Sequence, residues 1–111
     1  MKIAILGSRD YLHLHKVKHY VSTIPAGSTV ISGGYKGVDE CAATTARRRG
    51  LSIMVFNANW KRYGKTAGVR HMRDILEAAE RVVIYWDGKS RGSKILIAMA
   101  RKMGKPLQII R

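Results

Sequence analysis

The sequence predicts an α/β protein built on an open, mainly parallel sheet of five strands with helices on both faces. Along its 111 residues, short runs of Ile, Val and other large apolar residues alternate with longer amphipathic segments. The short runs are nearly continuous in apolar residues, which is typical of strands buried on both faces of a parallel sheet. They are bounded by Gly, Pro, Asn or Asp, the residues that favour turns.

Five segments have the length and composition of strands. In chain order they are Lys2 to Leu6, Ser28 to Ser32, Leu51 to Phe56, Arg81 to Tyr85 and Pro106 to Ile110. The four segments between them are long enough for helices, namely Tyr11 to Thr23, Gly37 to Arg49, Ala67 to Glu80 and Gly92 to Met103. Strict alternation of strand and helix predicts right-handed crossovers within one sheet.

Each predicted helix carries an apolar stripe at a spacing of three or four residues. The stripes are Leu14, Val17, Val21 and Ile24; Ala42, Ala43 and Ala46; Met72, Ile75, Leu76 and Ala79; and Ile95, Leu96, Ala98 and Met99. Gly50 follows the second helix and Gly104 the fourth, and glycine commonly ends helices. Because no linker, repeat or low-complexity tract divides the chain, we expect a single domain over residues 1–111.

The charge balance is strongly basic, with 21 Lys and Arg against 7 Asp and Glu and a net charge of +14. Such a surface attracts polyanions or phosphorylated small molecules. The single cysteine, Cys41, excludes an intrachain disulfide and a multi-cysteine zinc site, and we expect neither a metal nor a cofactor. The apolar run at Ile3 to Leu6 is too short for a signal peptide, and no run reaches the length of a membrane span. We therefore expect a soluble cytoplasmic protein.

Three segments rich in glycine, serine and basic residues follow predicted strands. They are GSRD at 7–10, SGGYKGVD at 32–39 and WDGKSRGS at 86–93. Glycine lets the backbone approach an anion, and a following helix presents unpaired N–H groups and its positive end. Each segment alone also fits a simple turn with a helix cap. Because all three lie at the carboxyl edge of one predicted sheet, together they favour a phosphate site.

The order of GSRDY, ISGGYKGVD, NANWKRYGKTAGVRHMRDIL and VIYWDGKSRGS resembles the YspA-like branch of the SLOG superfamily over essentially the whole chain. This Rossmann-like group also includes the LOG phosphoribohydrolases and the DNA-processing protein DprA. Because relatives commonly self-associate, we predict a homodimer or higher homo-oligomer to which the third or fourth predicted helix contributes apolar surface. The resemblance also implies a Rossmann-like fold and a bound nucleotide or nucleotide-derived ligand. It assigns ligand binding to Gly7, Ser8, Arg9, Gly33, Gly34, Gly37, Asp39, Trp60, Tyr63, Arg70, Trp86, Gly88, Ser90, Gly92 and Ser93.

The chain departs from the family pattern at three positions. Tyr35 follows the double glycine where the family usually has alanine, and His71 stands where it usually has asparagine. Ser93 replaces a threonine and keeps the hydroxyl, so that change is mild. The histidine removes an amide that can both donate and accept hydrogen bonds, which indicates a change in ligand preference.

Three functions remain open. The leading hypothesis is a binding module that senses or sequesters the ligand. The second is a LOG-like hydrolysis of a nucleoside-phosphate glycosidic bond, with Asp39 and Arg70 as catalytic residues, although the stretch SGGYKGVDE lacks the proline and the GTxxE of those enzymes. The third is DprA-like binding of single-stranded DNA, because the segment Trp60 to Arg73 interleaves five cations with two aromatic residues. Solvated cations around a packed loop are the alternative interpretation of that segment.

Overall fold

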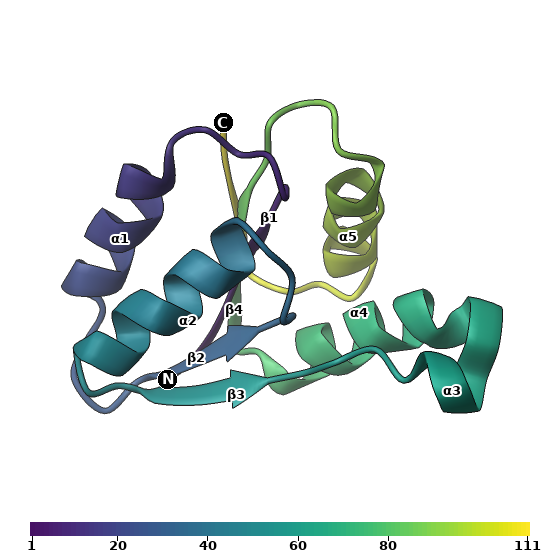
Figure 1. Cartoon of the computed structure of the whole chain (residues 1–111), viewed down its shortest axis with the longest axis horizontal. Helices are drawn as coiled ribbons and strands as arrows, with labels where there is room; N and C mark the ends of the chain where they lie inside the picture. The colour runs from purple at the N-terminus through teal and green to yellow at the C-terminus, as the bar shows by residue number, and fades with distance from the viewer.

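Five parallel strands form one sheet in the order β3-β2-β1-β4-β5. The computed structural model describes residues 1–111, with the chain coloured from end to end in Figure 1. The strands are β1 (Lys2–Gly7), β2 (Thr29–Ser32), β3 (Ser52–Val55), β4 (Arg81–Tyr85) and β5 (Leu107–Ile110). The helices are α1 (Leu14–Thr23), α2 (Val38–Arg48), α3 (Trp60–Tyr63), α4 (Ala67–Ala78) and α5 (Arg91–Lys102), with a 3₁₀ turn η1 (Gly64–Thr66). The predicted α/β class and its five strands are confirmed.

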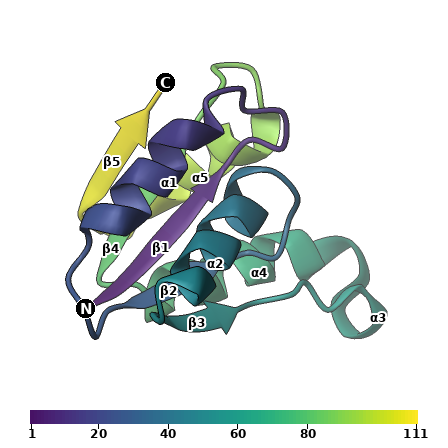
Figure 2. The same ribbon diagram turned by 60° about the vertical axis from the view of Figure 1, so that its left-hand side comes forward.

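Helices cover both faces of the sheet, α1 and α2 on one side and α4 and α5 on the other (Figure 2). Alternate residues of β1 belong to two separate cores: Ile3 and Ile5 pack beneath α1 and α2, whereas Ala4 and Leu6 pack against α4 and α5. Since successive side chains of a strand point to opposite faces, a strand with two buried faces needs apolar residues throughout. This requirement explains the unbroken apolar runs of the sequence.

The strand order reverses between β1 and β4. From β1 the chain moves outward through β2 to β3, then crosses the sheet to β4 and continues to β5 on the other side. The connections that leave β1 and β4 therefore diverge, and in open parallel sheets this arrangement opens a crevice at the carboxyl ends of the strands. The three glycine-rich segments of the sequence all lie at this edge.

The connection from β3 to α4 contains a short helix that the sequence did not predict. Helix α3 has four residues, and the Asn59 side-chain oxygen at its start accepts a hydrogen bond from the Arg62 backbone N–H at 3.0 Å. Together with η1 it projects from the body of the molecule beyond β3 (Figures 1 and 2). A single helical turn is too short to produce a periodic pattern, so no pattern in the sequence predicts this helix.

Helix α1 begins at Leu14, the first residue of its apolar stripe and three residues later than the predicted start at Tyr11. Tyr11 is buried, but its backbone N–H donates to the Ser8 carbonyl at 3.2 Å in a turn that precedes the helix. None of the helices is long and apolar enough to cross a membrane.

Candidate ligand-binding site at the carboxyl edge of the sheet

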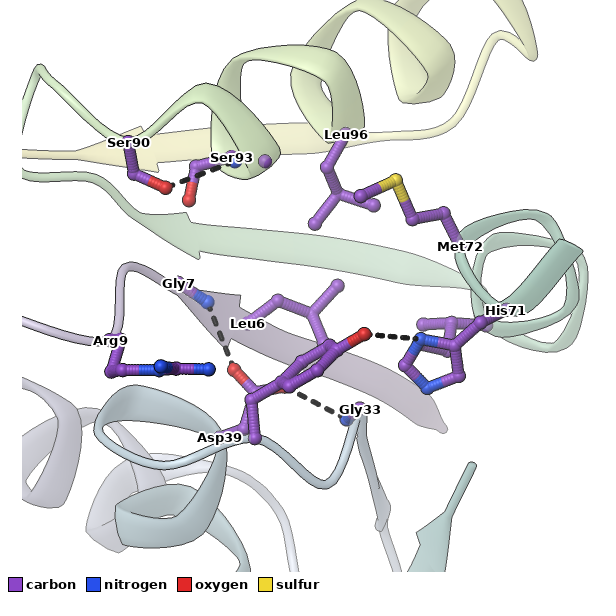
Figure 3. Close-up of a pocket in the computed structure, with 13 residues that line it drawn as sticks. Leu6, Gly7, Arg9, Gly33, Asp39, His71, Met72, Ser90, Ser93 and Leu96 are labelled. Carbon is purple, nitrogen blue, oxygen red and sulfur yellow. Dashed lines mark hydrogen bonds between the residues drawn. The ribbon is translucent and has the colours of Figure 1, made fainter. Parts of the chain in front are cut away.

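A cavity of about 320 Å³ opens at the point where the strand order reverses (Figure 3). It lies between the ends of β1 and β2, the first turn of α5 and the inner face of α4. Its size is at the lower end of the range for small-molecule sites. The lining residues are Leu6, Gly7, Arg9, Gly33, Tyr35, Asp39, His71, Met72, Ile75, Ser90, Gly92, Ser93 and Leu96.

Asp39, in the first turn of α2, is a buried carboxylate on the cavity wall, 2% exposed. One of its oxygens, Oδ1, accepts a hydrogen bond from the Gly7 N–H at 3.2 Å, and Oδ2 accepts one from the Gly33 N–H at 3.0 Å. Both dashed lines at this residue in Figure 3 mark these bonds. The carboxylate therefore connects the ends of β1 and β2 to the start of α2.

Burial raises the pKa of Asp39 from 3.8 to about 7. Removing a carboxylate from water disfavours its charged form, while backbone N–H groups, chiefly those of Gly7 and Gly33, oppose the shift by stabilising the anion. Near neutral pH the side chain is consequently divided between a charged form and a neutral form that holds a proton.

Position 33 must be glycine because the Asp39 carboxylate leaves no room for a side chain there. A Cβ atom there would lie 2.6 Å from Asp39 Oδ2 and 3.3 Å from the Ile75 Cδ1 atom. The backbone N–H groups of the double glycine are both engaged within the protein, since Gly33 donates to Asp39 and Gly34 donates to the Ser32 hydroxyl at 3.2 Å. Gly34 and Gly37 adopt positive φ angles of 78° and 87°, which shape the loop without a Cβ penalty.

The loop before α5 forms the polar end of the cavity. The Asp87 carboxylate accepts hydrogen bonds from the N–H groups of Lys89 and Ser90, both at 2.8 Å, and these bonds lower its pKa. Ser90 caps α5, because its hydroxyl accepts from the Ser93 N–H at 3.3 Å. The Ser8 hydroxyl accepts from the Asp87 N–H at 3.1 Å, which ties the loop after β1 to the loop after β4.

This end of the cavity favours an anion. The first turn of α5 contains no acidic residue, and a helix start carries partial positive charge on its unpaired N–H groups. A Cβ on Gly92 in that turn would meet nothing within 4 Å, so the backbone is open to a ligand. Arg9 contributes a cation from the loop after β1, and Figure 3 shows its side chain extending toward Asp39 beneath Gly7.

The opposite end of the cavity is aromatic and apolar. The rings of Tyr35 and His71 meet edge to face with centroids 5.3 Å apart, and the Tyr35 hydroxyl lies 3.5 Å from His71 Nδ1. His71 is 4% exposed, whereas Tyr35, on the loop after β2, is 40% exposed. Leu6, Met72, Ile75 and Leu96 complete this part of the wall.

Seven of the residues assigned to ligand binding from the sequence line the cavity: Gly7, Arg9, Gly33, Asp39, Ser90, Gly92 and Ser93. Ser8, Gly34 and Gly37 support the loops around it from outside the lining. Trp86 does the same, because its indole N–H donates to the Ser90 carbonyl at 3.0 Å. A Cβ at Gly88 would collide with the Arg111 guanidinium, which also packs over the Trp86 ring.

Trp60, Tyr63 and Arg70 lie elsewhere, on the projecting segment and the start of α4. The Arg70 guanidinium packs over the Tyr63 ring, 4.3 Å from its centroid, and neither residue lines the cavity. This placement separates Arg70 from Asp39, the partner that the hydrolase hypothesis gives it.

Tyr35 and His71 also line the cavity, although the sequence assigns neither to ligand binding and marks both only as departures from the family pattern. One signal could have identified His71: it lies four residues before Ile75, on the inward stripe of α4, which runs along the cavity. Tyr35 has no such signal, because its position depends on the turn that the flanking glycines make.

The comparisons with known proteins agree with this architecture. The model of the YspA, cpYpsA-related SLOG family (YAcAr) matches residues 1–63. The X-ray structure of DNA processing protein A (DprA) from Streptococcus pneumoniae is similar, with a TM-score of 0.85 and 20% sequence identity. The alignment covers 99% of this chain and 50% of that chain, so the protein spans about half the length of the DprA structure. A search of curated proteins finds no match. The family match spans more than half of the residues, and the chain belongs to the YspA, cpYpsA-related SLOG family.

Proposed function

We propose that the cavity binds a nucleotide or a nucleotide-derived ligand, and that the protein acts as a binding module that senses or sequesters it. One observation carries the proposal: a single cavity at the strand reversal has a positively charged polar end, an aromatic and apolar end, and a buried carboxyl between them. A nucleotide is complementary to this order of groups: its phosphate suits the positive end, its ribose the carboxyl, and its base the aromatic and apolar end. Membership of the SLOG family supports a nucleotide-related role in general.

We place the phosphate at the first turn of α5, beside Arg9, rather than on the double glycine. The Gly33 and Gly34 N–H groups already donate within the protein, and the Asp39 carboxyl would repel a phosphate that approached Gly33. The start of α5 has a cap, open space at Gly92 and no acidic residue in its first turn. Helix starts of this kind bind phosphate through their N–H groups and their dipole.

A charge introduced at Gly92 tests this placement. Because a side chain there meets open space, Gly92→Asp should fold, and an acidic residue in the first turn even favours the helix. We expect Gly92→Asp to weaken binding of a nucleoside monophosphate by at least tenfold in calorimetry, while Gly92→Asn, of equal size and no charge, retains most of the affinity. Equal affinities for the two variants would contradict a phosphate at α5.

The proposal is for binding rather than hydrolysis because of how Asp39 is held. Both of its oxygens accept backbone hydrogen bonds, and Arg70 packs on Tyr63. We expect the wild-type protein to release no free base from nucleoside monophosphates, and Asp39→Asn to change ligand affinity without any change in base release. Base release that disappears in Asp39→Asn would establish a hydrolase instead.

A second candidate function, binding of single-stranded nucleic acid, is favoured by the projecting segment. Trp60 is 58% exposed at its start, and the guanidinium groups of Arg62 and Arg70 pack on the Tyr63 ring at 5.2 and 4.3 Å. The chain has no acidic residue between Glu40 and Asp74. Exposed aromatic rings stack on bases, and cations pair with phosphates.

Oligonucleotide titrations at several salt concentrations test this second function. We expect the affinity to fall steeply as salt increases, because phosphate contacts release counterions. Trp60→Ala should weaken binding by about tenfold through loss of base stacking. Val69→Ala is the matched control, since Val69 is also apolar and 47% exposed near the start of α4. Similar affinities for the two variants would exclude stacking on Trp60.

A further inference from the structure

Two of the departures from the family pattern, Tyr35 and His71, are in contact with each other in the cavity. Tyr35 comes from the loop after β2 and His71 from α4, 36 residues further along the chain. Their rings meet edge to face at 5.3 Å, and no other aromatic residue lines this cavity. The pair therefore forms the aromatic wall at the end where the proposed function places the base.

The hydrogen bond on the far side of the ring determines where the proton of the imidazole lies. His71 Nε2 is within hydrogen-bond distance of the Phe56 carbonyl oxygen. A carbonyl oxygen can only accept, so Nε2 carries the hydrogen. In a neutral imidazole the other nitrogen, Nδ1, then has a free lone pair. Figure 3 shows the His71 ring directed into the cavity.

The acceptor at Nδ1 is weakly satisfied within the protein. Its partner, the Tyr35 hydroxyl, lies at 3.5 Å, which is the outer limit for a hydrogen bond. The Tyr35 side chain is 40% exposed on a loop between two glycines of positive φ, Gly34 and Gly37. A ligand with a well-placed N–H donor can therefore take this acceptor from the tyrosine.

We propose that the Tyr35–His71 pair selects for bases with an exocyclic amino group, and that the protein prefers such a base to its oxo counterpart. Tyr35 supplies an aromatic surface for the base, and His71 Nδ1 accepts a hydrogen bond from the amino group. An oxo group at the same position would set its lone pair against that of Nδ1 in a buried site, which is costly. The inference rests on the proposed function, because it specifies the ligand of that same cavity.

Adenosine monophosphate and inosine monophosphate form the matched pair of probes, since their bases differ in an amino or an oxo group at one carbon and in the protonation of the neighbouring ring nitrogen. We expect calorimetry at pH 8 to give about tenfold tighter binding of the adenosine nucleotide to the wild-type protein. His71→Asn should bind both nucleotides with similar affinity, because an amide can present either a donor or an acceptor. Tyr35→Phe keeps the ring and frees Nδ1, so it should retain the preference.

Tyr35→Ala provides a second readout that leaves His71 itself in place. It removes an exposed side chain, so the fold should persist. Loss of stacking should weaken the binding of both nucleotides by about tenfold without changing the ratio of their affinities. Equal wild-type affinities for the two nucleotides would overturn the inference and leave the proposed function standing. Failure of both nucleotides to bind would overturn the proposed function together with it.

Discussion

At the scale of single residues, Asp39 determines much of the geometry of the site. Its carboxyl is 2% exposed and holds the ends of two strands through the N–H groups of Gly7 and Gly33. These bonds offset part of the cost of burying a carboxylate, yet desolvation still prevails and raises the pKa to about 7. Asp39 thus has a structural role, and the charge of its side chain changes near neutral pH.

The first prediction concerns the pH dependence of stability. A folded-state pKa of about 7 against 3.8 for an ordinary Asp means that the folded protein binds the Asp39 proton more tightly than the unfolded chain. The free energy of unfolding should therefore fall as pH rises from about 4 to about 7, and then level off. Between pH 5 and pH 8 we expect Asp39 to contribute a decrease of about 2 to 3 kcal/mol.

Urea unfolding of wild type and Asp39→Asn at both pH values measures this contribution, because the other titrating groups cancel in the comparison. Glu40→Gln is the control, since Glu40 is the next residue of α2 and is exposed. This variant should keep the wild-type pH dependence. An Asp39→Asn protein with an unchanged pH dependence would contradict the burial of a titrating carboxyl.

The second prediction concerns Gly33, where a side chain has no room. Gly33→Ala places a Cβ 2.6 Å from the Asp39 carboxylate, and overpacking of this kind costs about 1 to 3 kcal/mol. Gly68→Ala adds the same methyl group near the start of α4, where the nearest atom is Trp60 Cη2 at 3.6 Å, and should leave stability unchanged or slightly higher. Thermal unfolding of both variants checks this difference. Equal unfolding temperatures for the two would count against the close packing of Gly33 on Asp39.

At the scale of the elements, the start of α5 is organised by side chains before it. Asp87 fixes the turn by accepting from the Lys89 and Ser90 N–H groups, and Ser90 then caps the helix. The Trp86 indole N–H anchors the Ser90 carbonyl at 3.0 Å. The first turn of α5 is thereby in place before any ligand arrives, which reduces the ordering cost of binding.

The third prediction follows from this cap. Ser90→Ala removes the oxygen that accepts from the Ser93 N–H, and loss of an N-cap costs about 1 kcal/mol. We expect a decrease of several degrees in the unfolding temperature, measured by circular dichroism. Ser22→Ala is the control, because Ser22 is exposed near the end of α1, where its hydroxyl donates within its own helix. An equal decrease in both variants would show that Ser90 has no particular role as a cap.

The sequence predicted the sheet well because burial on both faces leaves a direct mark: a strand such as β1 must be apolar at Ile3, Ala4, Ile5 and Leu6. It also located the loops of the cavity, since parallel strands bring their ends together. It could not predict that the Gly33 N–H binds the Asp39 carboxylate, or that Tyr35 contacts His71, because both contacts join segments that are separate in the sequence. Helix α3 could not be predicted because a single turn is too short to show helical periodicity.

At the scale of the whole molecule, the outer surface of α4 and α5 has two properties with opposite effects on self-association: exposed apolar side chains favour it, and net positive charge opposes it. A groove of about 600 Å³ runs between these helices and includes the apolar residues Ile95, Ala98, Met99 and Met103. Ile95 is 42% exposed. The same groove carries two cations, Arg73 and Lys102, against one acid, Glu77, on a chain with a net charge of +14. Apolar burial would favour contact between two copies through this face, whereas their like charges would repel each other.

The last prediction is that the protein forms a homodimer through the α4–α5 groove, and that added salt strengthens it. Salt screens the repulsion between two chains of +14, whereas the apolar contact persists. We expect light scattering at tens of micromolar, a range suited to weak and moderate association, to give a larger dimer fraction as salt increases. Ile95→Lys should shift the protein toward monomer, because it buries a further cation in the contact. Leu12→Lys is the matched control, since Leu12 is 86% exposed on the loop before α1 and should leave association unchanged. A clean monomer at every salt concentration would refute the dimer, and a dimer that Ile95→Lys leaves intact would place the contact on another face.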